Sequence, residues 1–206
     1  MTRAIFLPPW RVDVTVRDGV SLPASMARLS RMVAAALDAA GAPAPASIGL
    51  ILTDDTELAG LNATHMGKDG PTDVLSFPLL QPGAFPPHPG APGPGTTGMT
   101  GTQAASPAEA FPLLPGRRQH LGDIVISVQR AVEQATAGRG GQTGNVRWAA
   151  MDELRLLAVH GTLHICGWDH AEPEEEAAMR ALEQRLLSPA SSSRTGSSTS
   201  ERTGPD

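Results

Sequence analysis

Cysteine and tyrosine are nearly absent from this 206-residue chain, which holds one cysteine, Cys166, and no tyrosine. A single cysteine cannot form a disulfide within the chain, which excludes a disulfide-bonded scaffold and fits a reducing compartment. Aromatic residues amount to only 3% of the chain, while hydrophobic residues reach 40%. The chain can therefore build a hydrophobic core, although few aromatic rings are available for it.

Long hydrophobic runs are also missing. No stretch approaches the ~20 consecutive apolar residues of a membrane span. The apolar run near the start, Ala4 to Leu7, is too short for the hydrophobic region of a secretory signal. We therefore expect a soluble, cytoplasmic protein with no membrane partner.

Positive charge is not in excess, because the formal net charge is −5 at pH 7. Affinity for phosphate backbones comes mainly from clustered Lys and Arg. The negative net charge therefore argues against a protein that binds nucleic acid through its overall electrostatic field. It leaves room for a local basic groove, or for a nucleic acid that another partner presents.

Glycine and proline are plentiful, at 22 and 19 residues, but unevenly placed. Many of them fall within residues 81–117, whose composition predicts a disordered insertion between two neighbouring strands. The Ser/Thr-rich segment 188–206 predicts a disordered tail. The length fits one domain, which we expect to span residues 1–187 with the insertion inside it.

Hydrophobic periodicity divides the remaining chain into strands and helices. Alternating or short apolar runs predict four strands, at 11–17, 47–52, 72–78 and 121–128. Apolar spacings of three and four predict helices at about 22–40, 148–166 and 172–187, with shorter ones after Thr53 and Ser127. The sequence thus predicts a single-domain α+β fold, with a small mixed sheet of about four strands packed with helices.

The segment "HGTLHICGWDH" concentrates three of the six histidines of the chain, His160, His164 and His170. His160 and His164 are four residues apart on a predicted helix, so both project from one face. Gly167 ends that helix and lets the chain reverse, which brings His170 back toward the pair. Three imidazoles suit one Zn²⁺ ion and leave a fourth position for water, as in catalytic sites. The sequence predicts a three-histidine metal site at the helix end, although nickel, copper and iron also accept imidazole.

The same histidine spacing occurs in metzincin peptidases, where a glutamate follows the first histidine and acts as general base. This chain has Gly161 at that position, so the peptidase chemistry loses its proton acceptor. Glycine costs about 1 kcal/mol relative to alanine within a helix. We take Gly161 as a sign that space is needed near the metal.

Three separated segments resemble motifs of one protein family. "HGTLHICGWDH" is similar to the H-G-x-L-H-x-x-G-[YW]-D-H signature of the YbeY family, the metal-dependent endoribonucleases and rRNA maturation factors of bacteria. "LNATHMGKDGPTDVLSFP" and "LGDIVIS" resemble two further motifs of that family. The resemblance covers roughly residues 52–187. It implies a small sheet backed by helices, with the metal held by His160, His164 and His170.

The chain departs from the family where an aromatic residue and an arginine are usual. It has His65 and Met66 there, so a positive charge that would face RNA phosphate is missing. Lys68, two residues further on, is a candidate replacement and a candidate substrate-binding residue.

Three other residues are candidates around the site. Asp169 precedes the third histidine, where it would either handle a proton and orient an imidazole or cap the turn. Ser76 is a candidate for lining a substrate groove. Asp123, a polar residue in an apolar strand, would either support a ligand from behind or face solvent.

The resemblance implies a single-strand-specific, zinc-dependent endoribonuclease that matures the 3′ terminus of 16S rRNA and acts in late-stage 70S ribosome quality control. Its partners would be rRNA and the small ribosomal subunit, reached through a ribosomal protein. Two alternatives stay open. One is a zinc-dependent hydrolase of peptides or small molecules, which Gly161 disfavours; the other is a non-catalytic ribosome assembly factor with a structural zinc, which Met66 favours.

Overall fold

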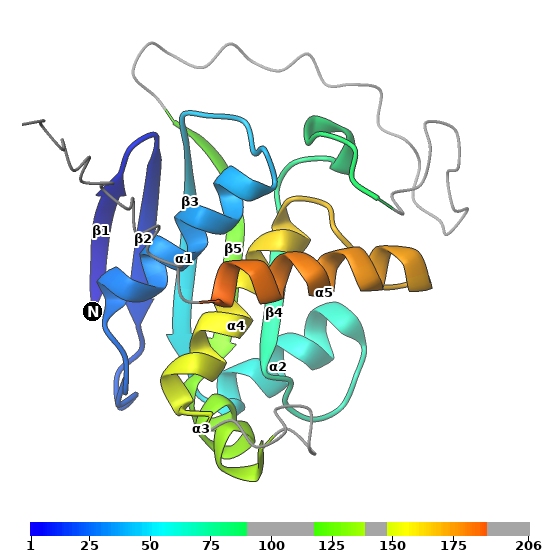
Figure 1. Ribbon diagram of the computed structural model, residues 1–206. Coiled ribbons are helices and arrows are strands. Elements are labelled where there is room, and N and C mark those ends of the chain that lie inside the picture. Colours follow the sequence, from blue (N-terminus) through cyan, green and yellow to red (C-terminus); the bar gives the residue numbers. More distant parts are fainter. Residues whose placement is uncertain (90–117, 139–147, 189–206) are drawn as a thin grey trace, which may run out of the picture.

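A computed structural model describes residues 1–89, 118–138 and 148–188 (Figure 1). Its strands are β1 (Thr2–Leu7), β2 (Trp10–Val16), β3 (Ala46–Thr53), β4 (Val74–Pro78) and β5 (Gln119–Ser127). They form one sheet in the order β1-β2-β3-β5-β4. The three central strands are parallel, whereas β1 and β4 pair antiparallel at the edges. The sheet is therefore mixed, as the sequence predicts.

The helices that the structure describes are α1 (Met26–Ala39), α2 (Asp55–Met66), η1 (Pro82–Ala84), α3 (Val128–Ala137), α4 (Ala150–Ile165) and α5 (Pro173–Leu187). Two of them begin at a side-chain cap, because Asp54 accepts a hydrogen bond from the Glu57 amide and Ser127 accepts one from the Arg130 amide. Gly167 follows α4 with a φ of 85°, a conformation that favours glycine. These observations confirm the predicted helix boundaries at Ser127 and Gly167.

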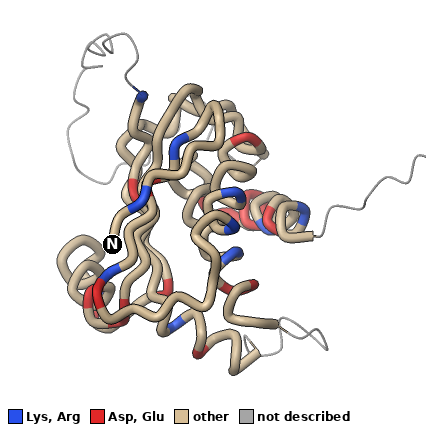
Figure 2. Tube along the Cα trace, turned by 90° about the vertical axis from the view of Figure 1, so that its left-hand side faces the viewer, with Lys and Arg blue, Asp and Glu red and all other residues tan. Residues whose placement is uncertain are grey.

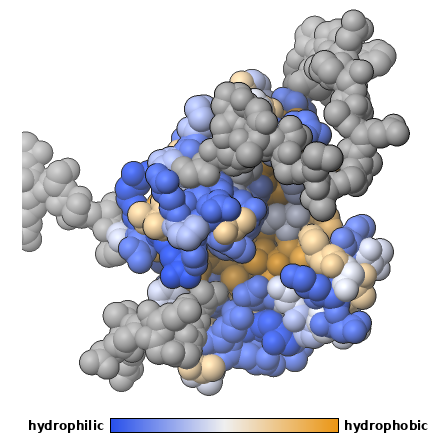
Figure 3. All heavy atoms as spheres, turned by 90° about the vertical axis from the view of Figure 1, so that its right-hand side faces the viewer, coloured by the Kyte–Doolittle hydropathy of each residue, from blue (hydrophilic) through white to orange (hydrophobic). Residues whose placement is uncertain are grey.

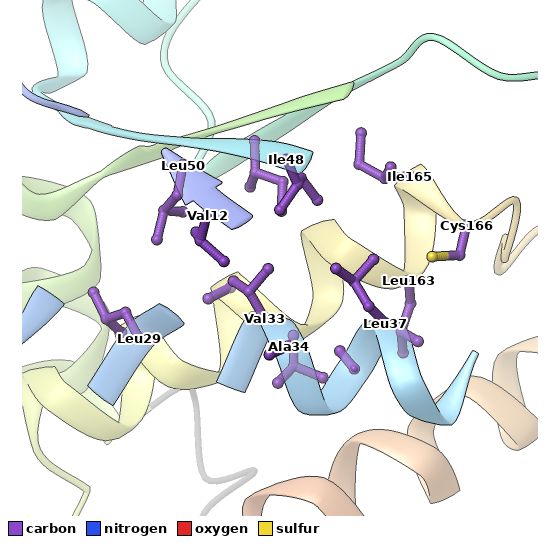
Figure 4. Packing of buried hydrophobic residues seen from close by; sticks show 14 of the residues in the cluster. Val12, Leu29, Val33, Ala34, Leu37, Ile48, Leu50, Leu163, Ile165 and Cys166 are labelled. Carbon is purple, nitrogen blue, oxygen red and sulfur yellow. The ribbon is translucent and has the colours of Figure 1, made fainter. Parts of the chain in front are cut away.

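The main core lies between the sheet and the pair α1 and α4. Leu29 and Val33 of α1 and Leu163 of α4 meet Ile48 and Leu50 of β3 in this layer (Figure 4). α5 packs in turn against α4, on the side away from the sheet (Figure 1). The described residues thus form an α+β fold in which α4 is enclosed between the sheet and α5.

The opposite face of β4 and β5 carries a smaller cluster, in which Leu58 of α2 packs with Leu75 and Val125. Consecutive residues of a strand point to opposite faces. Ile124 belongs to the main core and Val125 to the smaller cluster, so β5 contributes to both layers. This alternation decides which strand residues can reach helix α4.

The sheet has five strands rather than about four, because β1 is not predicted from the sequence. Residues Thr2–Leu7 are mostly exposed and lack a clear alternation of apolar and polar side chains. They pair antiparallel with β2 through backbone hydrogen bonds, which any residue except proline can make. Such an edge strand leaves little trace in the hydrophobic pattern.

The first residues of the predicted insertion are ordered, which corrects the expectation of disorder from residue 81. Residues 82–84 form η1, and the Phe85 side chain lies within the main core. His88 stacks on Trp168 with ring centroids 4.2 Å apart. The contacts of Phe85 and His88 anchor this stretch, although its composition is rich in proline and glycine.

The remainder of the insertion, 90–117, lies outside the described residues, and so does the predicted disordered tail apart from Ser188. Within the described ranges, no helix combines the length and the hydropathy needed to cross a membrane.

Candidate metal centre

The three predicted histidines come together in the structure. His160 and His164 lie one turn apart on α4, and the chain reverses at Gly167 so that His170 faces them from the following turn. One ring nitrogen of each histidine lies within 4.8 Å of the other two. The structure thus places three imidazoles around one point at the C-terminal end of α4.

The geometry of this cluster suits a metal ion. The Nε2 atoms of His160 and His164 are 3.1 Å apart. Two nitrogens bound tetrahedrally to one Zn²⁺ at 2.0–2.1 Å would be about 3.3 Å apart. The two nitrogens are therefore already spaced as two ligands of one ion. The residues fit the Zn²⁺ ion that the sequence predicts.

His164 is held neutral by its surroundings. Burial, followed by the nearby His160 and His170, lowers the pKa of His164 to about 4. A neutral imidazole has a free lone pair, which is the form that binds metal. At neutral pH this ring is therefore ready to coordinate without losing a proton.

Glu183 of α5 supports His160 from behind. Its Oε1 lies 2.7 Å from His160 Nδ1, and its side chain is only 12% exposed. A proton held on Nδ1 by this carboxylate leaves Nε2 free to face the other histidines. Glu183 is not predicted from the sequence, because its only signal is a glutamate between the apolar Leu182 and Leu186 on a predicted helix.

A second network holds the turn between His164 and His170. His88 stacks on Trp168, and its Nε2 lies 3.2 Å from the Gly167 carbonyl. Glu175 of α5 accepts a 2.8 Å hydrogen bond from the Asp169 amide and lies 3.6 Å from His88 Nδ1. Residues from two other parts of the chain, His88 and Glu175, therefore fix the backbone that carries the third histidine.

A cavity of about 800 Å³ opens beside the histidines, with His160 and His170 in its wall. It is bounded by one face of α5, by α4, by the start of β4 and by Trp148. Seen from the side of α2 and α5, hydrophobic residues line a hollow between two hydrophilic lobes (Figure 3). The histidine cluster thus opens onto a concave surface that can admit a substrate.

Asp169 is exposed next to the cluster, and its Oδ1 accepts a hydrogen bond from the His170 amide at 2.8 Å. This contact lies within the turn that carries the third histidine. Ser76 instead donates to the Gly161 carbonyl at 3.0 Å, between β4 and α4. The structure therefore gives the Ser76 hydroxyl a partner inside the fold.

Asp123 does not lie with the histidines. It shares the face of β5 that carries Val125, opposite to the face against which α4 packs. There its Oδ1 lies 3.1 Å from His120 Nε2. Lys68 and Met66 lie on the exposed surface at the end of α2, and Met66 is 45% exposed. The structure thus brings Asp169 to the cluster but places Asp123 elsewhere.

Gly161 has a different role from the one suggested by the sequence. A Cβ at this position would lie 2.6 Å from Ile124 and 3.2 Å from the Ser76 hydroxyl. The missing side chain therefore lets α4 approach β4 and β5, and does not open space at the metal. Cys166 is buried, and burial raises the pKa of its thiol to about 12, which fits a core residue.

From the side of β1, the Lys and Arg positions of the described residues lie among Asp and Glu positions (Figure 2). This distribution agrees with the net charge of −5. Contacts with a polyanion would therefore rest on local groups at the site.

Comparisons with known proteins identify the family of the chain. The family model described as Endoribonuclease YbeY matches residues 16–191. The chain is 41% identical to Endoribonuclease YbeY of Salinispora tropica over 153 residues, covering 74% of this chain and 79% of the relative. It is 36% identical to that of Thermobifida fusca, covering 85% and 91%, and 35% identical to that of Mycobacterium tuberculosis, covering 85% and 81%.

The solution structure of a Thermotoga maritima protein, TM1509, also matches, with a TM-score of 0.45 and 18% identity over 86% of this chain and 88% of that one. The family model spans most of the chain, and relatives above 30% identity cover more than two thirds of it. The chain therefore belongs to the YbeY family of endoribonucleases.

Proposed function

We propose that this protein is a single-strand-specific, metal-dependent endoribonuclease with one Zn²⁺ per chain. The observation that carries the proposal is the convergence of three histidine nitrogens within 4.8 Å, beside a cavity, in a member of an endoribonuclease family. A site with three protein ligands and an open position is of the catalytic type.

In this proposal His160, His164 and His170 hold the metal. A bound Zn²⁺ would acidify a water and polarise the scissile phosphate. Glu183 keeps His160 oriented through Nδ1, and His88 and Glu175 hold the turn that carries His170. The Oδ1 of Asp169 accepts from the His170 amide, so we assign the proton transfer to its Oδ2.

Substrate contacts are assigned by exposure. Lys68 is exposed after α2 and is our candidate for an RNA phosphate contact. The Ser76 hydroxyl donates a hydrogen bond to the Gly161 carbonyl of α4, so we do not assign it to the substrate. Because Asp123 is paired with His120 on the other face of the sheet, we do not assign it to support of the metal either.

We further propose that the substrate is ribosomal. The family resemblance points to maturation of the 3′ terminus of 16S rRNA and to late-stage 70S ribosome quality control in the cytoplasm. A net charge of −5 gives little general affinity for RNA. Docking on the small subunit through a ribosomal protein would supply the affinity that the chain itself lacks.

The test combines metal content with cleavage of a labelled single-stranded RNA. We expect about one zinc per chain, cleavage by the wild type, and loss of both zinc and cleavage in His164→Ala. A His164→Ala protein that lost zinc but cut RNA at the wild-type rate would refute the proposed mechanism.

Met66 favours one alternative, a ribosome assembly factor that does not cut RNA, because it is exposed where the family usually has an arginine. Met66→Arg distinguishes the two. Cleavage by the wild type supports the nuclease. Zinc binding without cleavage, with activity only in Met66→Arg, would support the assembly factor.

A further inference from the structure

The cavity beside the histidines also extends to Trp148, which precedes α4, whereas His160 lies in the second half of that helix. Apart from the histidines and the charged residues, its wall combines an indole ring, aliphatic side chains and one primary amide, which include Trp148, Leu156, Leu157, Met179, Leu187 and Gln184. Its volume of about 800 Å³ lies within the range of small-molecule sites. This part of the wall is suited to a flat, largely apolar group that carries polar edges.

The indole of Trp148 is held in place. Its Nε1–H donates a 2.6 Å hydrogen bond to Glu153, whose side chain is fully buried in α4. Trp148 itself is only partly buried and lines the cavity. A ring fixed before a ligand arrives loses little conformational freedom on binding, which favours stacking.

The charges of the cavity select what can enter it. Asp73, Glu176 and Glu183 contribute carboxylates to its wall, whereas Arg180 contributes a cation and is already paired with Glu176. Away from the histidines, where a bound metal would attract a phosphate, these carboxylates disfavour a phosphate but do not repel a neutral ring. Of the parts of an RNA chain, the nucleobase is therefore the one that fits the cavity around Trp148.

We propose that this cavity binds one unpaired nucleobase on Trp148, from the same RNA strand whose phosphate is held at the histidines. The inference rests on the proposed nuclease function and adds a reason for its strand preference. A base within a duplex is stacked and paired, so its face cannot reach an indole inside a cavity. Because His160 and His170 line the same cavity, the base and a phosphate of the same strand can be bound together.

The first test measures binding of the base without cleavage. Adenosine 5′-monophosphate and ribose 5-phosphate are titrated calorimetrically into the full-length, metal-loaded protein, its Trp148→Phe variant and its Trp148→Ala variant. Stacking on an aromatic ring strengthens binding by roughly tenfold per base. We expect the wild type and Trp148→Phe to prefer the nucleotide by about this factor, and Trp148→Ala to bind both ligands equally.

Equal affinities in the wild type, or an unchanged preference in Trp148→Ala, would overturn the proposal. Cleavage of single-stranded RNA by the same three proteins separates it from the nuclease function. RNA cleavage with the same kcat/KM in Trp148→Ala and wild type would support the nuclease function and refute the base site. A base preference that depends on Trp148, in a protein that cuts no RNA, would support the base site and refute the nuclease function.

Discussion

The carboxylate of Glu183 is placed to set how strongly His160 binds a metal, since it holds the Nδ1 proton from 2.7 Å away. Loss of such a partner typically weakens metal binding 10–100-fold. We expect a loss of this size in Glu183→Ala and a smaller one in Glu183→Gln, which keeps an oxygen acceptor. Competition with a fluorescent zinc chelator measures both affinities.

Glu174→Ala is the matched control, because Glu174 is an exposed glutamate in the first turn of the same helix. Its zinc affinity should equal that of the wild type. Equal zinc affinities in Glu183→Ala and Glu174→Ala would show that the contact with His160 does not tune the site.

The lowered pKa of His164 makes the metal-free protein sensitive to acid. With a folded pKa of about 4 against an ordinary value of 6.5, only the unfolded chain takes up this proton between those two pH values. The free energy of unfolding should therefore be fully retained above pH 6.5 and fall toward pH 4, by roughly 3 kcal/mol. Urea unfolding of the metal-free protein at several pH values measures the slope.

His164→Gln removes the titrating group, so its unfolding free energy should change less over the same window. An identical slope in the two metal-free proteins would mean that the acid sensitivity comes from other groups.

Helix α4 reaches the sheet closely because Gly161 has no side chain. Alanine there would press on Ile124 and Ser76, and overpacking of this kind costs about 1–3 kcal/mol. The gain in helix propensity, about 1 kcal/mol, offsets part of that cost. We expect Gly161→Ala to lower the unfolding free energy by up to about 2 kcal/mol, the difference between these two figures, measured by urea denaturation.

Gly60 in α2 provides the control, because a Cβ there would meet nothing within 4 Å. At this position only the higher helix propensity of alanine changes the stability. Gly60→Ala should therefore stabilise the protein by up to about 1 kcal/mol. If both alanine variants gained stability, the close approach at Gly161 would carry no cost.

The segment that begins with η1 braces the turn of the third histidine through His88. His88→Phe keeps a ring on Trp168 but loses the contacts with Gly167 and Glu175, whereas His88→Ala loses both kinds of contact. We expect losses of about 1 and 2 kcal/mol, respectively, in thermal or urea unfolding. A His88→Ala protein as stable as the wild type would show that the segment does not support the turn.

The whole molecule has a hydrophobic core that does not depend on the histidines. The core is formed by the sheet with α1 and α4, and the metal site lies at one end of α4. We expect the protein stripped by a chelator to unfold cooperatively at a lower temperature than the zinc-loaded protein. At zinc concentrations near 1,000 Kd the difference amounts to about 4 kcal/mol.

Calorimetric scans with and without chelator measure that shift. A stripped protein with no unfolding transition would favour the alternative in which the zinc is structural. A transition that does not move with zinc would mean that the histidines bind none.

Local patterns in the sequence determined most of the fold and the three histidines. The alternation of apolar and polar residues predicted β2, and the helical spacing of apolar residues predicted α1, α4 and α5. A histidine pair four residues apart, followed by a helix-ending glycine, predicted the cluster. These features depend on residues close together in the chain. Periodicity and helix geometry relate such residues directly to one face or one turn.

Only the tertiary structure decided which distant residues surround that cluster. Glu183 meets His160 from 23 positions away, and His88 reaches Gly167 from 79 positions away, through packing of separate elements. The same packing turned Asp123 away from the site and gave Gly161 its role against Ile124. The residues that surround the site therefore follow from how the helices and the sheet pack together, which no single stretch of sequence encodes.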